Sequence, residues 1–218
     1  MKEKFMNGLL TLAVVLMMQL LWWFGIHGPN VMSAVTTPFM TKMMATNLEL
    51  YQAGEGVTAS GVFYTAGSKY SIIANPFASG WFSSTGSGIT MGLIVAIMLF
   101  SKRDDFKAIA KLAIPCGIFN INEPIIFGIP MVMNPMFAVP FFLAPVACVC
   151  CGYLVQSLGL CSLFVIDVPW TTLVGLFGFL ASSGNIMGAI WQAVIILGVS
   201  TLIYTPFVIA ANRQTEEA

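Results

Sequence analysis

One carboxylate stands alone in a long apolar part of this chain. Between Lys111 and Asp167 lie 55 residues, and Glu123 is the only charged residue among them. A carboxylate at the centre of a membrane-spanning helix costs about 2.5–3.5 kcal/mol on insertion scales, so such a residue usually faces a polar cavity. We therefore predict that Glu123 belongs to a functional site, although a carboxylate can also serve only to cap a helix start.

The backbone around Glu123 is interrupted at short intervals. Pro124 follows it directly, and four more prolines come at near-regular spacing: Pro130, Pro135, Pro140 and Pro145. Each proline removes a backbone hydrogen bond, and broken backbone at membrane depth must be buried in protein or line a watery space. We expect segment 112–135 to be re-entrant, with Glu123 at its tip.

Other polar residues with site chemistry lie in two places. His27, the one histidine, ends the first apolar run, and Gly28 after it lets a ligand or another backbone approach closely. His27 is explained equally well as a helix cap or as a base or hydrogen-bond partner for Glu123. Asn120 and Asn122 precede the carboxylate and suit recognition of a polyol.

The composition is that of an integral membrane protein. The chain is 58% hydrophobic and 8% charged, with a mean hydropathy of +0.88, whereas soluble domains carry about 25% charged residues. Net charge is zero and there is no basic stripe, so we expect membrane lipid around the chain and no nucleic acid partner. Cys148, Cys150 and Cys151 lack histidines or carboxylates at ligand spacing, so we predict buried thiols, no metal and no cofactor.

Four stretches are long enough to cross a bilayer, which takes about 20 apolar residues. They are Phe5–Ile26, Gly86–Phe100 with an upstream extension through Trp81, Met136–Gln156 and Ile186–Ala211. Val168–Leu180 is shorter and stays open between a partial span, a re-entrant piece and an interfacial helix. Residues 28–79 are mixed, and we expect short helices there. The chain is therefore predicted to be an all-α, polytopic helical bundle with re-entrant hairpins.

Charge predicts the orientation. Basic residues crowd into one short loop at 101–111, which the positive-inside rule places in the cytoplasm: Lys102, Arg103, Lys107 and Lys111. Residues 28–79 are then outside. If the C-terminus is cytoplasmic as well, the chain must cross the membrane an even number of times after this loop, and Met136–Gln156 and Ile186–Ala211 supply two crossings. The Glu123 segment and Val168–Leu180 must then either both cross the membrane or both return to the side on which they began. The prolines favour a Glu123 segment that returns.

Several stretches, taken in order along nearly the whole chain, resemble a known family. They are GIFNINEPIIFGIP at 117–130 with Asn134, Pro135 and Pro140 after it, WFGIHG at 23–28, GSGITMGL at 86–93 and YTPFV at 204–208. These resemble the enzyme IIC permeases of the phosphoenolpyruvate-dependent sugar phosphotransferase system, in the lactose, cellobiose and diacetylchitobiose group. Family members are longer, so the resemblance implies that residues 1–218 form the C-terminal, sugar-binding half of the enzyme IIC permease fold.

The resemblance also implies what the chain binds and where it lies. It implies a site for a β-linked disaccharide, a homodimer completed by the N-terminal half, and a multi-pass location in the bacterial plasma membrane. A separate IIB protein, charged in turn by IIA and HPr, would phosphorylate the sugar. No cysteine of this chain sits where its thiol would be activated, which agrees with a phospho-cysteine on that separate protein.

The site predicted from residues and resemblance together has two ionisable members. Glu123 would fix the reacting hydroxyl and take its proton, and His27 would assist it. Tryptophans stack on sugars or anchor membrane interfaces, and Trp81 is the one included here. The further sugar contacts predicted are Asn120, Asn122, Gly28 and Trp81. Two alternatives stay open: an ion-coupled transporter that uses Glu123 as a proton relay, and an inactive or assembly-only fragment.

Overall fold

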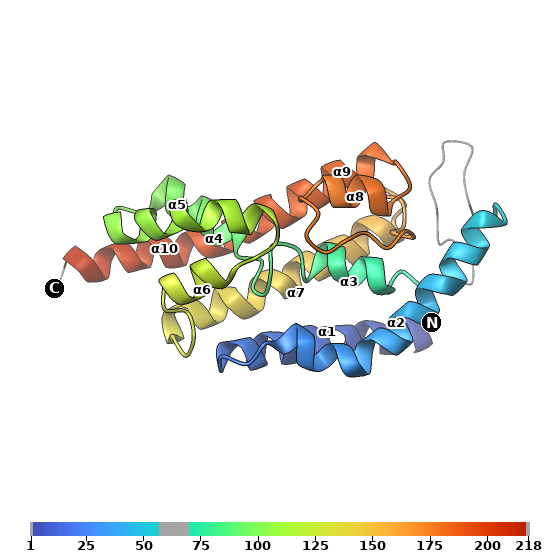
Figure 1. Ribbon diagram of the computed structural model, residues 1–218, viewed down its shortest axis with the longest axis horizontal. Coiled ribbons are helices and arrows are strands. Elements are labelled where there is room, and N and C mark those ends of the chain that lie inside the picture. Colours follow the sequence, from blue (N-terminus) through green and yellow to red (C-terminus); the bar gives the residue numbers. More distant parts are fainter. Residues whose placement is uncertain (1, 57–69, 217–218) are drawn as a thin grey trace.

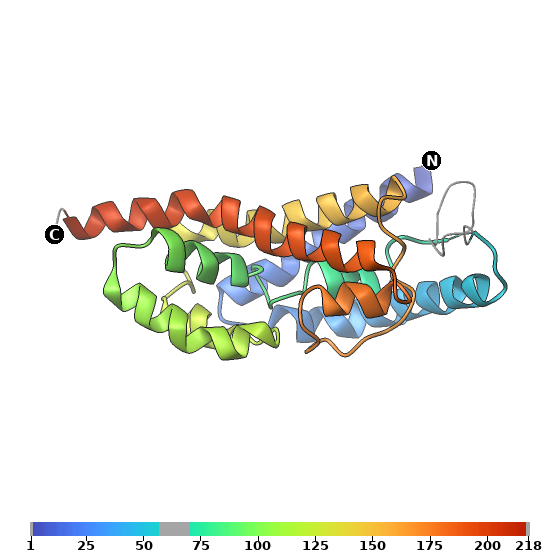
Figure 2. The same ribbon diagram turned by 90° about the horizontal axis from the view of Figure 1, so that it is seen from above.

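Every regular element is helical in the computed structural model, which describes residues 2–56 and 70–216. This confirms the predicted all-α fold. The long helices run along the long axis of the molecule (Figures 1 and 2). They are α1 (Lys2–Trp23), α2 (Gly28–Gln52), α7 (Pro135–Ser157) and a continuous rod made of α9 (Ile186–Ala193), the π-helix η1 (Val194–Val199) and α10 (Ser200–Glu216).

Two predicted spans are confirmed as long apolar helices. α7 covers Met136–Gln156, and the rod covers Ile186–Ala211; both are long and apolar enough to cross a membrane, by length and composition. α1 covers most of the first predicted span, Phe5–Ile26. Asn134 caps α7, because its side chain accepts a hydrogen bond from the Met136 amide at 3.0 Å.

The predicted span at Gly86–Phe100 is wrong. Two short helices, α3 (Asn75–Trp81) and α4 (Met91–Phe100), replace it, and residues 82–90 form a loop between them. Ten residues of α-helix extend about 15 Å, half of the roughly 30 Å hydrocarbon core of a bilayer. The break has a backbone cause: Thr85, Gly86, Gly88 and Ile89 have φ values between 50° and 79°, a left-handed conformation that a right-handed helix cannot contain.

The short helices expected at 28–79 form only in part: α3, which begins in this stretch, is short, but most of the described stretch is one long helix. α2 is one helix of 25 residues and continues through Pro38. Polar residues do not interrupt it, because nearly all of them lie on its less buried sides. The exception, the buried Asn47, bonds to the Ser71 backbone through its side chain. Residues 57–69 of the same stretch lie outside the described residues.

The basic loop expected at 101–111 is mostly helix. α5 (Asp104–Ile118) begins early, so Lys107 and Lys111 lie on its first turns rather than in a loop. Asn212, near the end of α10, fastens the short connection that remains: its side-chain oxygen accepts a hydrogen bond from the Lys102 amide at 2.9 Å. Which side of the membrane this connection faces stays a prediction.

Among the described residues, most buried apolar side chains gather in two large cores at opposite ends of the molecule, and Tyr70, Leu163 and Val165 form a smaller third cluster. One large core lies among α1, α3, the C-terminal half of α7, η1 and α8 (Leu176–Ala181); the other lies among α4, α5, α10, the N-terminal half of α7 and α6 (Glu123–Gly128). In Figure 1, α3 and α8 of the first core lie to the right of α4 to α6, which belong to the second. α7 and the rod pass through both cores and join them.

Two smaller predictions are decided by this packing. The apolar segment Val168–Leu180 forms no long helix: only its end is helical, as the start of α8, which packs back on α9. Of the cysteines expected to be buried, Cys148 is buried and Cys151 half-buried, but Cys150 is exposed on α7. The prediction is wrong for Cys150 because a continuous apolar run on a helix must also cover the face that points away from the core.

The tight crossing of α4 over the rod gives a stability test at Gly92. A Cβ atom there would lie 2.0 Å from Ser200 Oγ and 2.7 Å from its carbonyl carbon. We expect Gly92→Ala to destabilise the protein by roughly 1–3 kcal/mol, since overpacking forces helices apart. The measurement is the apparent melting temperature in detergent. Gly198→Ala is the matched control, because nothing lies within 4 Å of that position; equal losses in both variants would contradict the packing argument.

Candidate functional site

Glu123 is the first residue of α6, directly after the turn at 119–122 that joins α5 to α6. The two helices pack against each other as a hairpin (Figure 1). The Glu123 side chain is half-buried and forms no hydrogen bond or ion pair with any residue that the structure describes. Its carboxylate is therefore available to donors on a ligand. The hairpin has the shape expected of segment 112–135, and its depth in the membrane stays a prediction.

Asn120 fastens the same turn to two other segments. Its side-chain oxygen accepts a hydrogen bond from the Thr85 amide at 2.6 Å. Its side-chain nitrogen donates to the carbonyl of Trp170 and, at 2.9 Å, to that of Thr172. Both amide protons are used, so in this conformation Asn120 holds the site together and offers no donor to a ligand. Its φ of 66° is a left-handed value that asparagine tolerates better than most residues.

Asn122 joins the turn to the 82–90 loop a second time. Its side chain is buried and donates to the Ser87 carbonyl at 2.6 Å. It also lies directly over Gly86, where a Cβ atom would come within 2.3 Å of the Asn122 Cγ. The small residues at 83–88 thus permit the close approach of two protein loops.

Gly88 is held by two side chains that the sequence analysis missed. Its amide donates to Gln19 Oε1 of α1 at 2.8 Å, and its carbonyl accepts from the Tyr204 hydroxyl of α10 at 2.7 Å. Both side chains are fully buried, at 1% and 0% exposure. A signal was present for Gln19, since an amide side chain in the apolar run 8–26 requires a partner.

His27 lies in the turn between α1 and α2 and caps α2. Its Nδ1 accepts a hydrogen bond from the Asn30 amide at 3.2 Å, which confirms the cap interpretation. Because Nδ1 accepts, the neutral ring carries its proton on Nε2 and presents an N–H donor there. The ring packs on Trp22, with centroids 4.9 Å apart, and Trp22 in turn faces Phe127 of α6 at 6.2 Å. One indole therefore connects His27 to the helix that Glu123 begins.

Gly28 allows the backbone of α2 to approach the backbone of α1 closely. A Cβ atom at this position would lie 2.0 Å from the Met18 carbonyl oxygen of α1. The start of α2 can therefore pack against α1 only with glycine here. Contact between Gly28 and a ligand stays a prediction.

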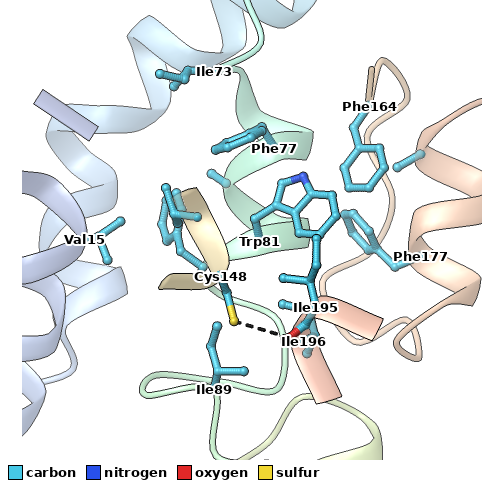
Figure 3. Packing of buried hydrophobic residues seen from close by; sticks show 14 of the residues in the cluster. Val15, Ile73, Phe77, Trp81, Ile89, Cys148, Phe164, Phe177, Ile195 and Ile196 are labelled. Carbon is cyan, nitrogen blue, oxygen red and sulfur yellow. Dashed lines mark hydrogen bonds between the residues drawn. The ribbon is translucent and has the colours of Figure 1, made fainter. Parts of the chain in front are cut away.

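Trp81 lies away from these residues, in the other core (Figure 3). Its ring is fully buried and stacks on Phe164, with centroids 5.3 Å apart and planes at 3°. Its other surroundings are equally tight, since a Cβ atom on Gly152 would come within 2.3 Å of the indole. No ring face is open to a ligand, so this conformation does not support the predicted role of Trp81. Trp170, in contrast, is 60% exposed beside the turn that Asn120 holds.

A groove elsewhere on the molecule includes none of the predicted site residues. It has a volume of about 440 Å³ and lies between α1, α3 and α7. Its lining is nearly all apolar, with Leu9, Leu12, Phe77, Val149 and Leu154 among its residues. Such a lining cannot recognise a polar ligand, so the groove is not the candidate site.

Comparison with known proteins agrees with this structure. The family described as "Phosphotransferase system, EIIC" matches residues 4–145. The cellobiose-specific EIIC component of Lactococcus lactis subsp. lactis (strain IL1403) is 36% identical over 94% of this chain and 43% of its own length. The lichenan permease IIC component of Bacillus subtilis (strain 168) is 38% identical over 89% of this chain and 40% of its own length.

A solved structure shows the same fold. The crystal structure of the transporter ChbC, the IIC component of the N,N'-diacetylchitobiose-specific phosphotransferase system, superposes with a TM-score of 0.83 at 33% identity. The match covers 94% of this chain and 44% of ChbC. The chain thus spans about two fifths of the length of the relatives it matches. It belongs to the EIIC family of the phosphotransferase system, in the lactose, cellobiose and chitobiose branch, and is a multi-pass protein of the bacterial membrane.

Proposed function

We propose that this chain is the C-terminal, sugar-binding part of a phosphotransferase-system permease and that it binds a β-linked disaccharide. The observation that carries this proposal is the free Glu123 carboxylate at the α5–α6 turn, which neighbouring loops hold in place. Relatives named for cellobiose, lichenan and diacetylchitobiose support a β-linked substrate.

The geometry supports a division of roles among the site residues. Glu123 accepts hydrogen bonds from sugar hydroxyls and orients the hydroxyl that is to be phosphorylated. The Nε2–H of His27 donates to a second sugar oxygen, since Nδ1 is already engaged in the helix cap. The exposed ring of Trp170 covers an apolar face of the sugar ring. In this role Trp170 takes the place first given to Trp81.

The proposal includes partners beyond this chain. Phosphorylation comes from a separate IIB protein supplied by IIA and HPr, and the rest of the permease, with its homodimer contacts, completes the translocation path. One relative in Staphylococcus aureus is named as a lactose-specific EIICB component, which supports a close functional pairing of a C part with a B part. Sugar bound at Glu123 would reach the cytoplasmic face, where phosphorylation traps it.

Uptake coupled to phosphoenolpyruvate tests the proposal. Membrane vesicles that contain this chain, the remainder of the permease, and IIB, IIA and HPr are expected to accumulate radiolabelled cellobiose as its phosphate. Accumulation should require phosphoenolpyruvate and persist when the proton gradient is collapsed. Uptake that follows the proton gradient without phosphoenolpyruvate would instead support an ion-coupled transporter. Complete vesicles that bind no disaccharide would support an assembly-only fragment.

Substituting the two tryptophans separates a sugar contact from a core residue. We expect Trp170→Ala to weaken cellobiose binding several-fold, because the contact between the indole and the sugar ring contributes about 1 kcal/mol to binding. The melting temperature should stay unchanged. Trp81→Ala should destabilise the protein by about 3–5 kcal/mol, because it empties a packed core. Titration calorimetry and thermal unfolding measure the two effects. A Trp170→Ala variant with full affinity would contradict the proposed stacking, and Trp170→Phe should retain most of it.

A further inference from the structure

We propose that Gln19 and Tyr204 are positioning residues for Glu123 and that they act through the backbone of Gly88. The inference rests on the role of Glu123 in sugar binding proposed above. It starts from the break between α3 and α4, which leaves backbone groups of the 82–90 loop without helical partners in an apolar part of the chain. At Gly88, Gln19 takes the amide at 2.8 Å and Tyr204 takes the carbonyl at 2.7 Å.

We call the two hydrogen bonds that Gln19 and Tyr204 make to Gly88 the clamp. A short series of contacts leads from this clamp to the carboxylate of Glu123. Gly88 follows Ser87, whose carbonyl accepts from the Asn122 side chain at 2.6 Å. Asn122 immediately precedes Glu123 and occupies the N-cap position of α6, where its side chain bonds to the 82–90 loop and not to the helix. The closeness of Asn122 to Gly86 leaves the two loops no room to slide past each other. The position of the Gly88 peptide therefore fixes the position of the Glu123 backbone, from which the carboxylate side chain extends.

The same clamp also relates Glu123 to His27. Gln19 lies on α1 one turn before Trp22, whose ring packs on His27. Tyr204 comes from α10, the helix that packs most closely on α4. When either hydrogen bond is removed, the 82–90 loop is no longer fixed in position relative to α1. The separation between Glu123 and His27 is then no longer fixed either. Gln19 and Tyr204 thereby set the separation of the two ends of the sugar site without touching the sugar.

The variants remove one polar group each at nearly constant volume. Tyr204→Phe deletes the hydroxyl, and Gln19→Met deletes the amide. Gln19→Glu retains an oxygen that can accept from the Gly88 amide and serves as the conservative replacement. Tyr153→Phe and Gln156→Met are the controls: both residues lie on α7, Tyr153 lines the apolar groove, and the buried Gln156 donates to the Ser162 carbonyl in the other core.

The first measurement needs no sugar. A membrane-permeant carbodiimide is applied to the complete permease, and its adduct on Glu123 is quantified by peptide mass spectrometry over time. A loosened turn exposes the carboxylate, so we expect at least threefold faster labelling in Tyr204→Phe and Gln19→Met. The rate should remain as in the unmodified protein in Gln19→Glu and in both controls. Unchanged labelling in Tyr204→Phe and Gln19→Met would overturn the positioning role.

The second measurement is a double-mutant cycle on cellobiose affinity. Tyr204→Phe and Gln19→Met should each raise the Kd three- to tenfold when Glu123 is present, and should have no further effect in the Glu123→Gln background. Equal losses in both backgrounds would overturn the proposal, because the residues would then act independently of Glu123. If the unmodified permease binds no cellobiose, the proposed function fails, and the labelling rates still decide whether the clamp positions Glu123.

Discussion

Glu123→Gln is expected to lower cellobiose affinity by roughly a hundredfold or more and to leave the protein equally stable. Hydrogen bonds to a charged group contribute about 1.5–3 kcal/mol each. A carboxylate that holds two sugar hydroxyls loses one of these bonds when one oxygen becomes an NH2 group, and the bond that remains is no longer strengthened by charge. Stability should not change, because Glu123 has no hydrogen-bond or ion-pair partner among the described residues. Most substitutions that abolish function in a membrane core also disturb folding, so this combination is diagnostic.

The measurement is titration of the detergent-purified permease with cellobiose, together with its apparent melting temperature. Glu49→Gln is the matched control, since Glu49 is an exposed glutamate of α2 outside the site. Full affinity in Glu123→Gln would remove Glu123 from the site. A large fall in melting temperature would instead show that the carboxylate serves the fold. Phosphoenolpyruvate-driven uptake should fall in parallel with affinity.

Asn120→Ala is expected to destabilise the protein by roughly 3–5 kcal/mol. The substitution removes three hydrogen bonds and leaves the Thr85 amide without its partner, and an unsatisfied buried donor costs about 1–3 kcal/mol. Alanine must also adopt a φ of 66°, at a cost of about 1–2 kcal/mol. The loss should be visible as a lower apparent melting temperature and a weaker yield of folded protein.

Asn120→Gly separates the two contributions. Glycine adopts a left-handed φ without strain, so Asn120→Gly should retain about 1 kcal/mol more stability than Asn120→Ala while it lacks the same hydrogen bonds. Asn30→Ala, at an exposed asparagine of α2, is the control and should melt like the unmodified protein. If both Asn120 variants are as stable as the control, the side chain does not join the three segments in the membrane.

Much of this fold follows from local pattern. α7 and the α9–η1–α10 rod were predicted because a run of twenty or more apolar residues suits a spanning helix whatever surrounds it. The prediction that Glu123 belongs to a site followed from the cost of its charge, which depends on apolar surroundings that are visible in the chain itself. Each of these inferences needed only neighbours along the sequence.

Other features depend on partners that are remote along the chain. The break at 82–90 is held by Asn120 and Asn122, 35 residues away, and by Tyr204, 116 residues away. Apolar residues on both sides favoured one continuous span there, whereas remote hydrogen bonds at Thr85, Ser87 and Gly88 hold the left-handed backbone of the loop.

The sequence by itself determined that the protein is a helical membrane protein and which family it belongs to, and it singled out Glu123 as the candidate for a site. The tertiary structure decided which polar residues are free to meet a ligand. Asn120 and Asn122 stand beside Glu123 in the chain and have the right chemistry. Yet the whole side-chain amide of Asn120 is hydrogen-bonded to the 82–90 loop and the segment at 170–172, and the buried Asn122 donates to the 82–90 loop. Trp81 is enclosed by Phe164 and Gly152, whereas Trp170 is exposed. The physical reason is that hydrogen-bond capacity and ring faces are limited, and which partner takes them is settled only when distant segments pack together.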